Sequence, residues 1–176
     1  MRATLGLLAL LAQASSGNAP GDEYFGKLSM SALHVRYETM QLRKRYETHQ
    51  LLPDQTLHLL LLTDDAYMGW ARRYPRDDWL PSTGFAIAQL YEELPGATAR
   101  TRAVALLKYV AASFPKSSYA ARSRAQLHRG VATKPYPAWA RPTPAPSPSP
   151  APSPSSVPSP SSAPSPSPKP STASSL

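Results

Sequence analysis

The side chains that most often carry chemistry are few in this sequence and are not paired. Four histidines occur, and no two are three or four residues apart, the spacing that places two ligands on one helix face: His34, His49, His58 and His128. Cysteine is absent. A metal site would need ligands from distant segments, so we expect neither a metal nor a cofactor.

Three adjacent acidic pairs are the remaining candidates for acid–base catalysis: Asp64-Asp65, Asp77-Asp78 and Glu92-Glu93. Neighbouring side chains on a helix point about 100° apart, so the first and last pairs do not form a general acid and base by themselves. The middle pair stands at a turn and is interpreted as a helix cap. The sequence also lacks a glycine-rich phosphate loop and a nucleophile elbow. We therefore expect no enzymatic activity.

Basic residues are the other group with a possible binding role. Residues 15–95 contain 8 Lys/Arg and 11 Asp/Glu, a balance of −3, whereas residues 96–141 contain 9 Lys/Arg and no acid, a balance of +9. This end of the chain either binds an anionic polymer or is an ordinary solvated surface. The residues that would contact a polyanion are Arg100, Arg102, Lys108, Lys116, Arg122, Arg124 and Arg129.

The elements that would position these residues are helices. Apolar residues recur at helical spacings, and prolines separate the periodic segments. The predicted helices cover residues 24–50, 53–74, 81–94, 98–113 and 118–129, the last with Ser117 or Ser118 as its N-cap. Strand-like alternation is absent from the sequence. These patterns predict an all-α fold of about five helices.

Burial is expected along one face of each helix. On the first helix this face comprises Phe25, Leu28, Ala32, Val35, Leu42 and Tyr46. One continuous core is predicted from Trp70, Phe85, Tyr91, Leu107 and Val110.

Two segments, 66–79 and 106–119, match each other at a shift of 40 residues. Each contains an aromatic residue and a proline at the end of a helix, Tyr74-Pro75 in one and Phe114-Pro115 in the other. A basic residue, two polar residues and a second aromatic follow in both. A fixed shift of this size indicates stacked supersecondary units.

The third and fourth predicted helices resemble a tetratricopeptide hairpin. Ala88 and Tyr91 match the small residue and the tyrosine of its first helix, and the second-helix spacing is kept by Ala103, Leu107, Val110 and Pro115. The connecting turn is longer than the family's. Residues 113–120 are similar to the inter-repeat phrase of two bacterial envelope families, the outer-membrane assembly lipoproteins and the Tol–Pal coordinators. The resemblance covers residues 64–129 and implies stacked antiparallel hairpins that bind protein segments on a concave surface.

The start of the sequence is typical of a secretory signal peptide. Arg2 precedes an apolar run from Leu5 to Ala12, and Ala12-Gln13-Ala14 is a small-x-small cleavage site. The run is about half as long as a bilayer-spanning helix, so no transmembrane anchor is expected after cleavage. The expected organisation is a signal peptide at 1–14, a flexible N-terminus at 15–21, a helical domain at 22–131 and a disordered tail at 132–176.

The tail from Pro142 onwards consists mostly of Pro, Ser and Ala, with Lys169 as its only charge. Such a segment has little apolar surface to bury. Three roles remain open: a spacer, a ligand for a proline-binding groove, or a glycosylated stalk.

These features together predict an exported, non-enzymatic protein-interaction adaptor or scaffold of the cell envelope, in the periplasm or outside the cell. The alternative is a basic module that binds an anionic envelope polymer, with the tail as a spacer. Export argues against nucleic acid as the partner.

Overall fold

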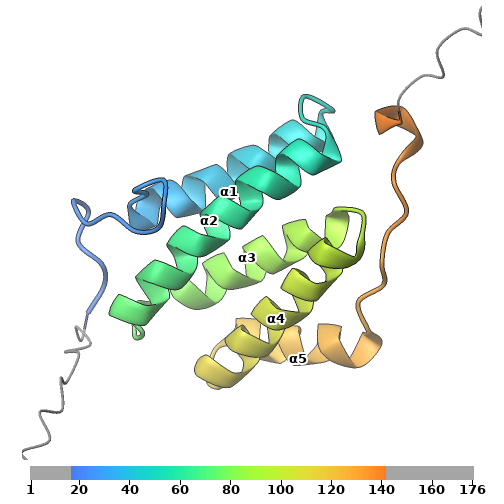
Figure 1. Ribbon diagram of the computed structural model, residues 1–176. Helices are drawn as coiled ribbons and strands as arrows, with labels where there is room; N and C mark the ends of the chain where they lie inside the picture. The colour runs from blue at the N-terminus through green and yellow to red at the C-terminus, as the bar shows by residue number, and fades with distance from the viewer. Residues whose placement is uncertain (1–16, 142–176) are drawn as a thin grey trace, which may run out of the picture. The chain divides into compact units, whose positions relative to one another are not determined.

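A computed structural model describes residues 17–141 of the chain (Figure 1). It contains five α-helices: α1 (Ala32–Glu47), α2 (Pro53–Arg73), α3 (Leu80–Glu93), α4 (Ala97–Ser113) and α5 (Ser118–Arg129). A short 3-10 helix covers Ala138–Ala140. The described residues form no strand, only two isolated bridges, so the predicted all-α class is confirmed for this part of the chain.

Local sequence signals mark boundaries of α2, α4 and α5. Pro53 stands in the first turn of α2, where its missing N–H is tolerated, and the backbone N–H of Leu52 donates to the Gln55 side chain at 3.1 Å. The hydroxyl of Ser117 accepts from the N–H of Tyr119 and caps α5. The aromatic-proline pairs at 74–75 and 114–115 follow the ends of α2 and α4, as predicted.

The first helix is shorter than predicted. It begins at Ala32, capped by the Ser31 hydroxyl, rather than at residue 24. The preceding residues form a tight turn in which Phe25 and Met30 exchange two backbone hydrogen bonds of 2.8 and 2.9 Å. Gly26 has φ +68°, and a Cβ there would lie 2.6 Å from the Cα of Ala66, so the turn crosses α2 closely. As a result Leu28, predicted to be buried, is 47% exposed.

The odd-numbered helices contact one another in chain order, α1 with α3 and α3 with α5. α1 packs against α2, α3 packs against α1, α2 and α4, and α5 packs against α3 and α4. Figure 1 shows α1 beside α2, with α3 next to them and α5 following α4. The odd-numbered helices therefore form a row, which we call the odd-helix row.

The predicted core residues are buried. Trp70, Phe85, Tyr91 and Leu107 belong to one apolar cluster, and Val110 is fully buried as well. The Tyr67 hydroxyl is also buried, and it donates to the backbone oxygen of Leu80 at 3.1 Å. Its hydrogen-bonding capacity is therefore not lost on burial.

Segments expected outside the domain contact it at both ends. The N–H of Ala19, in the segment predicted to be flexible, donates to the Asp77 carboxylate at 2.7 Å. The helical part of the chain was expected to end at residue 131, yet the residues up to Arg141 belong to the same compact unit. In this segment the Tyr136 hydroxyl donates to Asp54 at 3.0 Å, and the Trp139 ring stacks on His49 at 4.1 Å.

The predicted signal peptide and the Pro/Ser-rich segment from Pro142 lie outside the described residues. Within residues 17–141, none of the helices combines the length and the apolar character that crossing a membrane requires.

Candidate functional site

A groove between α1 and α3 is the main candidate site. It has a volume of about 380 Å³ and is lined by Leu33, Arg36, Tyr37, Thr39 and Met40 of α1 and by Ser82, Thr83 and Ala86 of α3. We call this set the α1–α3 groove. The α1 residues recur at helical spacing, and Ser82 and Ala86 are one turn apart, so each helix contributes one face.

The threonine and serine hydroxyl groups of the groove donate to backbone oxygens of α1 or of the residue just before α3. Thr39 donates to the backbone oxygen of Val35 at 2.8 Å, and Thr83 donates to that of Trp79 at 2.7 Å. Ser82 also donates to the Trp79 oxygen, at 2.9 Å. These three side chains therefore do not need a hydrogen-bonding partner from a ligand, and the groove favours apolar contacts.

Large apolar side chains stand exposed along the α1 side. Leu33 is 62%, Tyr37 53% and Met40 64% exposed. Their spacing of four and three residues places them in one stripe on the helix, away from the buried stripe of Val35 and Leu42. Single exposed apolar residues are common, but a contiguous stripe beside a groove indicates an interaction surface.

A cation stands at the rim of the groove. The guanidinium carbon of Arg36 lies 4.2 Å from the centre of the Trp79 ring. Stacking of this kind holds a guanidinium flat while its N–H edge remains available. The groove thus combines apolar walls with one positioned positive charge.

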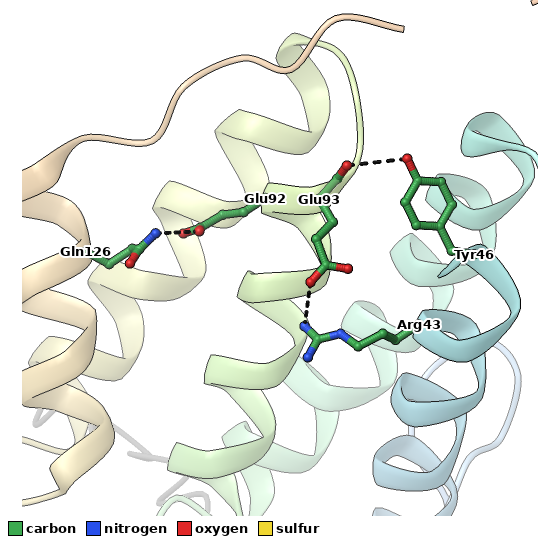
Figure 2. Close-up of polar contacts among 5 residues, drawn as sticks. All are labelled: Arg43, Tyr46, Glu92, Glu93 and Gln126. Atoms are coloured by element: carbon green, nitrogen blue, oxygen red, sulfur yellow. Dashed lines mark hydrogen bonds and ion pairs between the residues drawn. The ribbon is translucent and has the colours of Figure 1, made fainter. Parts of the chain in front are cut away.

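The two glutamates at the end of α3 connect the helices of the odd-helix row (Figure 2). Glu93 points towards α1, where its carboxylate pairs with Arg43 at 3.3 Å and its backbone oxygen accepts from the Tyr46 hydroxyl. Glu92 points towards α5 and accepts from the Gln126 amide at 2.6 Å. Burial raises the pKa of both carboxyl groups. This acidic pair links three helices, and its side chains diverge as the sequence predicted.

The seven basic residues predicted to contact a polyanion lie in several different environments. Arg100 donates to the backbone oxygen of Val131, Arg102 pairs with Asp64, and Arg124 donates to the backbone oxygen of Ala111. Lys108 is exposed on α4, and Lys116 lies in the turn before α5.

Only two of the seven are brought to one helix face within the odd-helix row. Arg122 lies over the Tyr119 ring at 5.5 Å, and Arg129 bonds with the Gln126 side chain. The two are seven residues apart on α5, which places them two turns apart on the same side. Several of the other basic side chains stabilise contacts within the fold.

Asp77 and His49, which the sequence also offered as candidates, make contacts within the fold. Asp77 caps the turn before α3 by accepting from the Trp79 N–H, and it also accepts from the Trp70 indole at 3.0 Å. His49 stacks on Trp139. Within residues 17–141 the structure groups no three histidine or carboxylate side chains in a way that would hold a metal ion.

Asp64 is the most buried charge on α2. It is 4% exposed, accepts from the Tyr91 hydroxyl at 3.3 Å and lies 3.7 Å from Arg102. Its second carboxylate oxygen is buried without a hydrogen-bonding partner among the described residues. Burial is the main reason that the pKa of Asp64 is raised, with Arg102 opposing the shift.

We predict that Asp64→Asn stabilises the protein most at neutral and alkaline pH. A raised pKa means that the folded state binds the proton more tightly than the unfolded chain does. The stability that the wild type gains from the proton on Asp64 is therefore complete below the ordinary carboxyl pKa and is lost as pH rises through the raised pKa. Asparagine keeps an acceptor for Tyr91 without the buried charge. Urea unfolding at a series of pH values should show a gain over the wild type that shrinks on acidification. A gain independent of pH would contradict the assignment.

The groove residues were missed by the sequence analysis, although a signal was present. Leu33, Tyr37 and Met40 form a second apolar stripe on a helix whose buried stripe was already assigned. An apolar stripe in excess of what the core needs indicates a binding face. The facing residues on α3 are small and gave no comparable signal.

Comparison with known proteins identifies no relative: neither a family model, nor a curated protein, nor a solved structure matches this chain.

Proposed function

We propose that the protein is a non-enzymatic adaptor that binds a segment of a partner protein in the α1–α3 groove. The observation that carries this proposal is the stripe of Leu33, Tyr37 and Met40, which is exposed along a groove whose threonine and serine hydroxyls already donate to backbone oxygens. Covering this stripe would remove apolar surface from water without leaving these hydroxyls unpaired.

The helix contacts support a tetratricopeptide-like stack as the framework. In this interpretation α1–α2 and α3–α4 are antiparallel hairpins, and α5 is the first helix of a third. Stacks of this kind bind extended partners on the surface lined by the first helices, which correspond here to the odd-helix row. From the signal-peptide pattern of the sequence we infer that this activity takes place outside the cytoplasm, in the cell envelope or beyond it.

Site-specific photocrosslinking in the native host would test the proposal. A photoreactive residue at position 37 should yield a crosslink to a defined protein, and a second one at position 28 serves as the control because Leu28 is also exposed but lies outside the groove. Mass spectrometry would identify the crosslinked species. Equal labelling from both positions, or labelling of neither, would contradict groove binding.

A pull-down from the host envelope without photocrosslinking, at low and at high salt, distinguishes the polyanion alternative. Attraction between exposed charges is screened over about 8 Å at physiological ionic strength, so polymer binding should fall steeply as salt rises. An apolar contact should persist. Recovery of a polymer that is lost at high salt, and lost in a Lys108→Gln, Lys116→Gln variant, would replace the adaptor with the basic module.

A further inference from the structure

We propose that the partner segment carries carboxylates beside its apolar residues. Arg36 of α1 and Arg122 of α5, the two outer helices of the odd-helix row, bind these carboxylates. This inference rests on the proposed function. It commits the groove to one chemical class of occupant, an acidic peptide segment with apolar anchors.

Arg36 is placed to bind an anion from outside the fold. It forms no ion pair with a carboxylate among residues 17–141. Its guanidinium rests on Trp79, and Leu33 and Met40 lie one turn away on either side. A carboxylate on the partner would therefore meet the guanidinium edge while the neighbouring residue of the partner enters the apolar groove.

Arg122 provides the matching group on α5. It also lacks a carboxylate partner among the described residues, and it stacks on Tyr119, whose ring lies 5.8 Å from that of Phe85 on α3. Gln126, four residues later, bonds with Glu92 of α3. Arg122 thus lies on the side of α5 that faces α3, as Arg36 lies on the side of α1 that faces α3.

Each of the two carboxylates that α3 contributes near this surface already has a partner on a neighbouring helix, although Glu92 Oε1 is buried without a hydrogen bond among the described residues. Glu93 pairs with Arg43, and Glu92 accepts from Gln126. They are thereby engaged on either side of α3, while Arg36 and Arg122 have no carboxylate to pair with in this part of the chain. Electrostatic complementarity therefore favours an acidic segment and disfavours a basic one, because like charges brought together in an interface are costly.

Selection from a random-peptide display library would test this inference on the full chain. The expected result is enrichment of peptides that contain both apolar residues and Asp or Glu, with enrichment lost on the Tyr37→Ala variant. Peptides selected on an Arg36→Gln, Arg122→Gln variant should keep the apolar residues and lose the acidic preference. Lys108→Gln is the matched control, because it removes a positive charge from α4, outside the odd-helix row.

Affinity measurements on an enriched peptide complete the test. We expect the Arg36→Gln, Arg122→Gln variant to bind about tenfold more weakly and Lys108→Gln to bind as the wild type does. Selection of apolar peptides without acidic residues would overturn this inference and leave the proposed function intact. Selection that does not depend on Tyr37 would overturn both. Circular dichroism of each variant would show that the helices are retained.

Discussion

Replacing Leu107 by alanine is expected to lower the free energy of unfolding by about 2–5 kcal/mol. Leu107 is fully buried on α4, within the apolar cluster that also contains Tyr91 of α3 and Trp70 of α2. Truncation removes buried methyl groups and leaves a cavity that rigid neighbouring helices fill only in part. Urea unfolding followed by circular dichroism measures the effect.

Leu33→Ala is the matched control for this prediction. The same atoms are removed, but Leu33 is 62% exposed, so the unfolding free energy should change by less than about 0.5 kcal/mol. Partner binding should respond in the reverse order, with Leu33→Ala weakening it and Leu107→Ala acting only through stability. A loss below about 1 kcal/mol for Leu107→Ala would place this residue outside the core.

Much of the fold could be predicted because strong local signals coincide with tertiary boundaries. Proline is poorly tolerated inside a helix whatever surrounds it, and Gly130 follows the last residue of α5, so α2 to α5 begin and end close to the predicted residues. The spacing of Trp70, Phe85, Tyr91, Leu107 and Val110 identified buried faces for the same reason, since helical periodicity is itself a consequence of one-sided burial.

The predicted start of α1 was wrong because a tertiary contact overrides the periodic pattern there. Phe25 is buried as predicted, but it is buried from a turn that crosses α2 at Ala66, and Gly26 permits that approach. Periodicity records which residues are buried and not the backbone conformation that buries them. The Ser31 cap was the local signal that marked the true start.

The contacts of the segment after α5 were not anticipated, for a compositional reason. Pro135 and Pro137 resemble the Pro-rich sequence that follows, and composition suggested one continuous tail. Tyr136 and Trp139 distinguish this segment, because aromatic side chains supply the apolar surface that the later sequence lacks. Aromatic residues within a Pro-rich stretch therefore indicate a packed extension of a domain.

The candidate site was harder to predict than the fold. Counting charges located the basic end of the chain but not which charges the fold uses, and Arg100 and Arg102 bond with Val131 and Asp64. The groove depends on α1 lying beside α3, which no local pattern records. Only the α1 half of the site, with its second apolar stripe, was accessible from the sequence.

Gly84→Ala is expected to destabilise the protein by about 1–3 kcal/mol, against the usual preference of helices for alanine. Gly84 lies inside α3, and a Cβ there would be 2.8 Å from Tyr67 Cζ and 2.9 Å from Val110 Cγ2, with the Tyr67 hydroxyl closer still. Tyr67 is fixed by its bond with Leu80 and by edge contacts with Trp70 and Tyr109. Space for the new methyl group would require the helices to separate.

Gly69→Ala provides the opposite case on α2. The atoms nearest to a Cβ at Gly69 would be Phe25 Cβ at 3.4 Å, Gly26 N at 3.5 Å and Arg72 Nη2 at 4.0 Å, all ordinary van der Waals distances. The substitution should therefore gain up to about 1 kcal/mol from helix propensity. Thermal and urea unfolding of the two variants should therefore give changes of opposite sign. A gain in both variants would contradict the prediction for Gly84, because it would mean that α3 has room for a methyl group beside Tyr67. A loss at Gly84 alone would identify this glycine as the residue that permits α3 to approach α2 and α4 and so fixes the α3 side of the groove.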